Sequence, residues 1–203
     1  MKKYFITLLL ATVLAVPAVA QFRYGVQAGL DITSLNFRQK LFTVDSSVGY
    51  SAGLFSELMF PGVGFGIDFS LRYEQRGATM HLGEKEIWAS QGYGNTRSYL
   101  HYLDLPIHLR FKYTNMNGLE EFFAPFIFAG PNFGFIIAHN KVPALKYASG
   151  DIGITVGIGC EIMRHWQVSF SRTFGMTYAV KTVLLTDMSA RSYSWDLRCA
   201  YLF

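Results

Sequence analysis

The chain has 203 residues and a formal charge of +4, and 51% of its residues are hydrophobic and 16% aromatic. Its length fits one domain, its small net charge gives no indication of nucleic-acid binding, and its two cysteines are too few for a disulfide framework. After residue 20, no uninterrupted apolar stretch is long enough for a transmembrane helix. The apolar side chains must therefore be accommodated in another way.

The first twenty residues have the features of a secretory signal peptide. Lys2 and Lys3 precede an apolar run, and Ala18-Val19-Ala20 forms a small-residue cleavage pattern. The run is shorter than the ~20 apolar residues that a membrane-anchoring helix needs. We predict a signal peptide over residues 1–20 and a single domain over residues 21–203.

Alternation of apolar and polar residues predicts strands along the rest of the chain. The first half is expected to hold four strands: Phe22–Ile32, Val48–Phe60, one beginning at Phe65 after the Pro61-Gly62 turn, and Tyr99–Tyr113. In each of them, apolar side chains occupy one face, and glycines, polar and charged residues occupy the other. Pro106 lacks a ladder donor and predicts a local bulge in the fourth strand.

The second half is expected to hold four more strands: Phe122–Ile137, Ile152–Ile162, one beginning at Trp166, and Ser192–Phe203. The fifth strand is apolar on both faces, and Gly130, Asn132 and Gly134 indicate that its even positions point inward. Arg172 falls on the outward phase of the seventh strand, where a charge is costly in lipid. This predicts a bulge near Ser171 or a position close to the rim.

Long and short connections alternate between these strands. The long ones cover residues 33–47, 76–98, 138–150 and 179–191, whereas the others are turns. Long outer loops and short periplasmic turns are typical of outer-membrane barrels, and a closed barrel satisfies every backbone group within lipid. We predict an all-β fold, a single eight-stranded antiparallel up-and-down transmembrane barrel in the bacterial outer membrane, with both termini periplasmic.

The charged residues distinguish this barrel from a secreted lipocalin-like barrel, whose interior would be apolar. They share the face that carries the glycines, and a narrow barrel can hold them only if opposite charges pair. We therefore predict an interior charge network of Arg23, Asp31, Glu57, Asp68, Arg72, Glu74, Asp104, His108, Arg110, Lys112, Glu161, Asp196 and Arg198. Such a filled interior also disfavours a pore.

The predicted loops carry more basic than acidic residues. Their basic side chains are predicted to form an extracellular rim of Arg38, Lys40, Arg76, Lys85, Arg97, Lys141, Lys146, Lys181 and Arg191. A rim of this charge could meet the phosphates of lipopolysaccharide. Solvated loop charge is the simpler interpretation.

One motif resembles a known family. Tyr102-Leu103-Asp104-Leu105-Pro106-Ile107-His108-Leu109 is similar to the Tyr-Leu-Glu-Ile-Pro-Leu-Leu-Leu signature of PorT-like outer-membrane beta-barrel proteins, and Ala129-Gly130-Pro131 agrees with it. The resemblance implies a barrel of about eight strands in the outer membrane of Gram-negative bacteria, in a family named after a component linked to type IX secretion. Asp104 replaces the glutamate and His108 an apolar residue, so no functional residue is transferred.

These patterns favour a non-enzymatic surface-interaction protein or an accessory protein of the envelope or of secretion. The expected partners are outer-membrane lipid, lipopolysaccharide and other envelope or secretion proteins, with no cofactor, metal or nucleic acid. The alternatives are a narrow pore and an enzyme with a site in the extracellular loops, for which the candidate groups are His81, Glu84, Glu86, Ser90 and His139. Clustering of these groups within hydrogen-bond range would favour the enzyme.

The two cysteines fall on the outward phase of the sixth and eighth strands. With one strand between them, the Cα atoms of Cys160 and Cys199 are expected to lie about 10 Å apart, too far for a disulfide. We predict two free thiols that face lipid.

Overall fold

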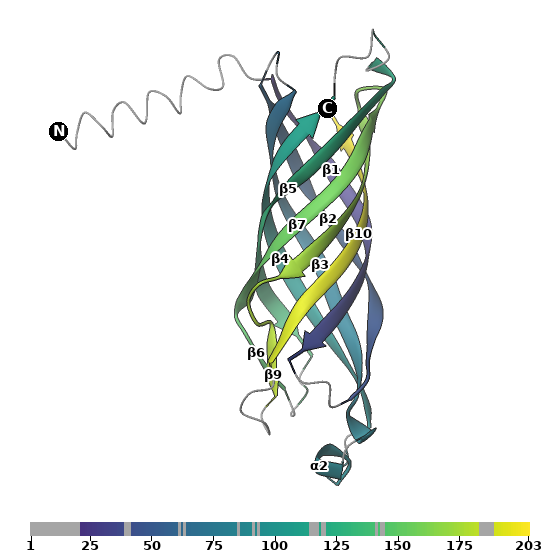
Figure 1. Cartoon of the computed structure of the whole chain (residues 1–203), viewed down its shortest axis with the longest axis vertical. Coiled ribbons are helices and arrows are strands. Elements are labelled where there is room, and N and C mark those ends of the chain that lie inside the picture. The colour runs from purple at the N-terminus through teal and green to yellow at the C-terminus, as the bar shows by residue number, and fades with distance from the viewer. Residues whose placement is uncertain are drawn as a thin grey trace, which may run out of the picture.

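The computed structural model describes residues 21–38, 42–60, 62, 64–84, 86–90, 92, 94–113, 118, 121–140, 142, 145–182 and 189–203, so the predicted signal peptide lies outside the described residues. The wall of the barrel consists of β1 (Gln21–Phe37), β2 (Val44–Met59), β3 (Phe65–His81), β4 (Asn95–Lys112), β5 (Phe123–His139), β7 (Gly150–Ile162), β8 (Trp166–Gly175) and β10 (Ser189–Leu202). Each strand pairs antiparallel with the next, and β1 pairs with β10 to close the barrel (Figure 1). The prediction of a closed eight-stranded antiparallel barrel is confirmed.

The two ends of the barrel differ. At one end, called the turn end here, β1 begins and β10 ends, and the strands are joined by short turns (Figure 1). The opposite loop end carries the short η2 (Leu82–Glu84) and α2 (Glu86–Ala89) helices and a small pair of strands, β6 (Leu145–Tyr147) and β9 (Val180–Thr182). Among the described residues, no helix is long and apolar enough to cross a membrane.

From the turn end to beyond the middle of the barrel, apolar side chains cover the outside of the wall. Tyr24, Leu30, Leu54, Leu109 and Ile158 are each about 60–70% exposed. Most of the inward positions between them are polar or charged and buried, with a few buried aromatic side chains such as Phe55, Phe126 and Phe128. This apolar band facing outward around a polar interior is the arrangement that lipid requires.

Closer to the loop end, the apolar face changes sides. On β1, Ile32 faces outward, but Leu35 and Phe37 face inward and are buried; on β3, Tyr73 faces outward, but Met80 is buried inside. The inward side chains form a loop-end core of Leu35, Phe37, Phe42, Ala78, Met80, Leu82, Leu100, Tyr102, Val142, Leu145, Ala179, Val180 and Ala190. Here the strands bury apolar surface away from water, as in a soluble barrel.

The strands are consequently longer than predicted. β1 continues to Phe37 and β2 begins at Val44, so most of the connection predicted over residues 33–47 is strand. In the same way, β3 and β4 take up much of the connection predicted over residues 76–98. The inversion of the apolar face interrupts the alternation, which made these strand ends look like loops.

Two predicted bulges are absent. The register between β3 and β4 is the same on both sides of Pro106, and the irregularity of β4 lies instead between His101 and Tyr102, where it pairs with β5. The pairing of β8 also runs unbroken through Ser171. Arg172 does face outward, and its guanidinium lies over the aromatic rings of Phe174 and Trp195, 4.7 and 4.6 Å from their centroids.

Two other details agree with expectation. The even positions of β5 point inward, since Asn132 is buried and Ile127 is exposed. Cys160 and Cys199 are free thiols, and each is directly opposite Val168 on the strand between them. Both predictions are confirmed.

Candidate functional site

Glu57 of β2 is the centre of an ion-pair cluster near the turn end. Its Oε1 accepts hydrogen bonds from Arg23 Nη2 and Lys112 Nζ, both at 2.7 Å, and its Oε2 accepts one from Arg110 Nη1 at 2.7 Å. Glu57 is fully buried. Because charge-assisted hydrogen bonds are stronger than neutral ones, this carboxylate joins three strands through its basic partners.

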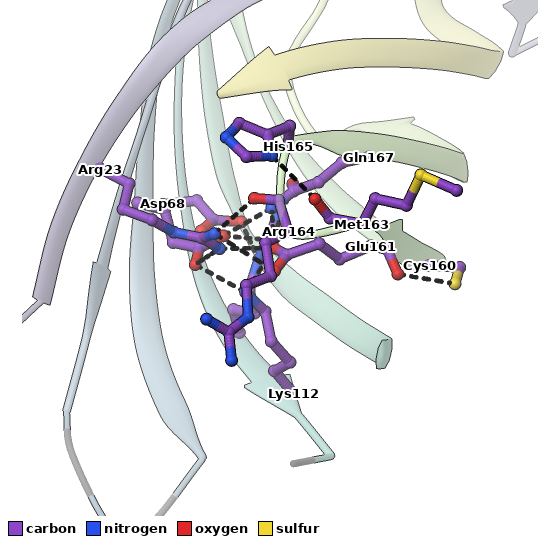
Figure 2. Close-up of polar contacts among 11 residues, drawn as sticks. Arg23, Asp68, Lys112, Cys160, Glu161, Met163, Arg164, His165 and Gln167 are labelled. Atoms are coloured by element: carbon purple, nitrogen blue, oxygen red, sulfur yellow. Dashed lines mark hydrogen bonds and ion pairs between the residues drawn. The ribbon is translucent and has the colours of Figure 1, made fainter. Parts of the chain in front are cut away.

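The same cluster contains two further carboxylates. Glu161 of β7 accepts a hydrogen bond from Lys112 at 2.7 Å and pairs with Arg23, and Asp68 of β3 accepts one from Arg110 Nε at 2.7 Å. Gln167 donates to both glutamates at 2.8 Å, and Figure 2 shows it near Glu161. This turn-end cluster (Arg23, Glu57, Asp68, Arg110, Lys112, Glu161 and Gln167) balances three carboxylates with three basic groups.

A second cluster lies between the turn-end cluster and the loop-end core. Arg76 of β3 donates from Nε to Glu74 at 2.6 Å and from Nη2 to Asp104, and its Nη1 lies 3.7 Å from Asp151. Its guanidinium also lies over the Tyr102 ring, 4.3 Å from the centroid. The prediction that Arg76 belongs to the rim is therefore wrong: β3 continues past Tyr73, so Arg76 points into the barrel.

This central cluster consists of Asp31, Arg72, Glu74, Arg76, Asp104, Asp151, Asp196 and Arg198, all of which are buried. Asp151 lies at the beginning of β7. His108 is also inside, with its ring 5.1 Å from that of Phe128, and its Nε2 has no hydrogen-bond partner among the described residues. The structure thus places all thirteen residues of the predicted network inside the barrel, twelve of them in the two clusters and His108 beside them.

Within the described residues, ion pairs and the loop-end core occupy the interior beyond a hollow of about 510 Å³ at the turn-end mouth, which is lined by Arg23, Glu57, Lys112 and Glu161 among others. An eight-stranded barrel is only wide enough for side chains to fill it, and here both charged and apolar side chains do so. This arrangement disfavours the pore.

The basic residues of the predicted rim are only partly within the described residues. Lys40, Lys85 and Lys141 lie outside them, whereas Arg38, Arg97, Lys146, Lys181 and Arg191 are exposed near the loop end. Arg97 donates to Ser47 Oγ at 2.6 Å. Lys181 and Arg191 both lie over the Tyr178 ring, 5.5 and 5.8 Å from its centroid.

Two hollows bring part of this rim together on the outside of the wall. One, of about 520 Å³, is lined by Arg38, Tyr178, Arg191 and Tyr193 among others. The other, of about 890 Å³, shares Tyr193 with it and adds Arg172. We call Arg38, Arg172, Lys181 and Arg191 the outer basic patch.

Arg172 also connects this patch to the lipid-facing wall. A groove of about 670 Å³ runs over β4, β5, β7 and β8, where its lining includes Leu109, Ile127, Ile158 and Phe170, and it also contains Arg172 and Trp195. From the sequence, Arg172 is a cost in lipid that a bulge or a position close to the rim would relieve, and its place in the loop-end hollow fits the second alternative. Its position between the outward aromatic residues Phe170 and Phe174 of β8 was the feature of the sequence that could have indicated this role.

His81 has the only histidine–carboxylate contact among the rim-enzyme candidates within the described part of the chain. Its Nε2 lies 2.8 Å from Asp45 Oδ2, and its Nδ1 lies 2.8 Å from Asn95 Oδ1. It lies beyond the apolar band, where Gln75, Gly77 and Thr79 are the outward residues of β3. Hydrogen bonds to Asp45 and Asn95 raise the pKa of His81, and a ring that donates from both nitrogens cannot accept a proton as a general base.

The other candidates do not join His81. Glu84 accepts hydrogen bonds from the backbone and hydroxyl of Thr43, at 2.8 and 3.2 Å, and the backbone N–H of Ser90 donates to the Glu86 carbonyl. The ring of His139 stacks on that of Tyr147, with centroids 4.0 Å apart. Within the described residues, these groups are dispersed.

The raised pKa of His81 predicts a pH dependence. A histidine whose pKa is higher in the folded state stabilises the fold fully below its unfolded pKa of about 6.5, and this contribution is lost as the pH rises through the folded value. The difference in unfolding free energy between the native chain and His81→Gln should therefore shrink as the pH rises above neutrality. Urea unfolding at several pH values measures it, and a difference that grows with pH would contradict the protonated ring.

Comparison with known proteins agrees with this geometry. A family model described as "Outer membrane protein beta-barrel domain" matches residues 17–179. A search of curated proteins finds no matching relative. Among solved structures, the chain is similar to the outer membrane protein OprG from Pseudomonas aeruginosa, with a TM-score of 0.57 and 12% identity over 91% of this chain and 97% of that one.

Two other solved structures are less similar. Ail, the attachment invasion locus protein of Yersinia pestis, has a TM-score of 0.44 and 12% identity over 90% of this chain and 99% of that one. The outer membrane enzyme PagL has a TM-score of 0.42 and 12% identity over 84% of this chain and 97% of that one. The likeness to OprG shows the fold, and the family model covers most of the chain: the protein belongs to the outer membrane protein beta-barrel domain family and is an integral protein of the outer membrane.

Proposed function

We propose that this protein is a non-enzymatic surface-interaction protein whose outer basic patch binds the phosphate groups of lipopolysaccharide. The observation that carries the proposal is the position of Arg172, which lines both the apolar groove and the rim hollow that it shares with Tyr193. An amphiphile with acyl chains and a phosphorylated headgroup matches this arrangement of an apolar groove next to a basic patch. Its acyl chains would lie in the groove, and its phosphates would contact the patch.

The patch is suited to phosphate in composition as well as position. Arg38 and Arg191 line one hollow and Arg172 the next, so guanidinium groups, which bind phosphate with two parallel hydrogen bonds, predominate. Tyr178 and Tyr193 lie beside them, and aromatic residues are enriched where a barrel leaves the hydrocarbon region. Lys181 adds a further positive charge.

The proposal places the loop end outside the cell and both termini in the periplasm. It is supported by the larger size of the loop end, which has its own apolar core and the additional elements η2, α2, β6 and β9. Longer connections on the outer side and short turns on the periplasmic side are usual in this class.

The resemblance to PorT-like proteins supports a finer proposal, an accessory role in the envelope or in secretion. Other envelope or secretion proteins would then contact the loop end, which the loop-end core holds rigid beyond the apolar band. The dispersal of His81, Ser90 and His139 within the described residues supports the non-enzymatic assignment.

Binding of purified lipopolysaccharide to the refolded protein tests the patch. The double variant Arg172→Glu/Arg191→Glu should bind about 30-fold more weakly or worse, because each basic residue near an anionic surface contributes about 1 kcal/mol. Dephosphorylated lipopolysaccharide should show little difference between the native chain and this variant. Titration with fluorescent lipopolysaccharide measures both.

Arg164→Glu is the matched control, because Arg164 is exposed at the opposite end of the barrel and paired with Glu121. It should bind lipopolysaccharide like the native chain. The control changes the net charge by two units and the double variant by four, so a loss of binding free energy in the control about half that in the double variant would show that net charge governs binding and that the patch is not the site.

A further inference from the structure

Three fully buried carboxylates meet where the barrel closes. Asp31 of β1, Glu74 of β3 and Asp196 of β10 each place one carboxylate oxygen within 4.8 Å of the others. Asp31 is also directly opposite Asp196 in the pairing of β1 with β10. Like charges directly opposite on neighbouring strands repel, so the closing pair of strands carries an unfavourable contact unless something neutralises it.

In each of these carboxylates, protein groups hold one oxygen and leave the other without a hydrogen bond. Asp31 Oδ1 accepts from Ser51 at 3.4 Å, and Asp196 Oδ2 accepts from Ser171, Thr173 and Ser194 at 3.3–3.4 Å. Their second oxygens, Asp31 Oδ2 and Asp196 Oδ1, have no hydrogen-bond partner within the described part of the chain. Buried polar atoms are normally paired, so these two oxygens call for either a proton or a bound cation between them.

Glu74 follows the same pattern. Its Oε1 accepts from Arg76 Nε at 2.6 Å, whereas its Oε2 forms no hydrogen bond and lies 3.3 Å from Arg72 Nη2 as an ion pair only. Arg198, the guanidinium that β10 contributes to this cluster, donates to Ser171 instead, and its Nε is also without a hydrogen-bond partner among the residues that the structure describes. The neighbouring cations therefore do not use the free oxygens as hydrogen-bond acceptors.

The charges of the central cluster do not balance. It contains five carboxylates (Asp31, Glu74, Asp104, Asp151 and Asp196) and three guanidiniums (Arg72, Arg76 and Arg198), an excess of two negative charges. His108 and Tyr102, whose hydroxyl donates to Asp151 at 3.5 Å, are further titratable groups beside it. The turn-end cluster, in contrast, is balanced. Uncompensated buried charge is costly, so the excess must be neutralised.

We propose that Asp31, Glu74 and Asp196 bind one divalent cation, calcium by preference, and that this ion stabilises the closure of β1 on β10. One divalent cation removes both excess charges, whereas protonation would have to occur on two of the five carboxylates. All three ligands are carboxylate oxygens, which suit a hard cation, and calcium tolerates an irregular, flexible arrangement of such oxygens, whereas magnesium demands a near-ideal octahedron.

Calcium content after refolding tests the site. The full chain, refolded from denaturant in detergent without lipopolysaccharide and with calcium chloride, is freed of loose metal by gel filtration and analysed by elemental mass spectrometry. We expect about one calcium per barrel, and a thermal midpoint about 5–10 °C higher than after refolding with a chelator. Metal-free native protein with the same midpoint in both conditions would overturn the proposal.

Variants locate the ion. Asp31→Asn and Asp196→Asn should each lose the bound calcium and the dependence of the midpoint on calcium, and Asp68→Asn, a buried aspartate of the balanced turn-end cluster, should keep both. If the asparagine variants do not refold, the calcium content of the native chain and the dependence of its thermal midpoint on calcium still test the proposal. Calcium that stays in both variants would place the ion elsewhere and overturn the assignment.

Discussion

Replacement of Glu57 by glutamine should lower the unfolding free energy of the barrel by about 3–5 kcal/mol, the usual effect of breaking a buried ion pair from one side. Glutamine keeps the shape of the side chain but removes the negative charge that faces Arg23, Arg110 and Lys112. These three cations would then share Asp68 and Glu161 alone. The loss should appear as a lower urea midpoint for the folded, fast-migrating band in detergent gels.

Glu121→Gln provides the control for this prediction. Glu121 pairs with Arg164 at 2.6 Å, but both side chains are more than half exposed, and exposed pairs contribute about 0–1 kcal/mol. A change at Glu57 as small as the change at Glu121 would show that the turn-end cluster is hydrated and that its charges are screened.

Gly25→Ala should prevent stable closure of the barrel. A Cβ added at Gly25 would lie 1.9 Å from the carbonyl oxygen of Tyr201, on the strand that closes against β1. Backbone atoms in a strand ladder cannot move aside without breaking the hydrogen bonds of that ladder, so we expect a loss of about 3 kcal/mol or more, at the upper end of the range for overpacking. The folded band in detergent gels should be largely lost.

Gly94→Ala is the matched substitution, because a Cβ at Gly94 meets no atom within 4 Å. It should leave the folded band unchanged. A Gly25→Ala chain that folds as well as Gly94→Ala would mean that β1 and β10 pair in a different register.

The alternation of residues predicts the membrane part of the fold well, because lipid outside and charge inside impose opposite demands on neighbouring residues. Glu57 and Asp196, for example, can be assigned to the interior from period two alone. Their partners cannot be assigned in this way, because which of the basic residues meets Glu57 depends on the register of β2 against distant strands.

Arg76 shows where the sequence reasoning ends. Beyond Tyr73 the outward residues of β3 become polar and the inward ones apolar, from Ala78 to Met80. The apolar residues thus move from the outward to the inward positions of the strand where the surroundings change from lipid to water. A search for constant alternation mistakes this point for the end of the strand. After Ile32, the apolar residues of β1 continue at the inward positions, as Leu35 and Phe37 show. A search that allows this change of face would have predicted the full lengths of β1 and β3.

The two free thiols make the outer wall of the barrel open to spectroscopy without added cysteines. Cys160 and Cys199 lie on either side of Val168, on β7 and β10, the two strands that flank β8. Side chains on this face point toward lipid. A nitroxide attached to either thiol would report collisions with oxygen, which is concentrated in the bilayer, more than with water-soluble relaxation agents. The ratio of the two collision rates gives the depth of the label in the bilayer, and hence the level at which the apolar band meets the headgroups.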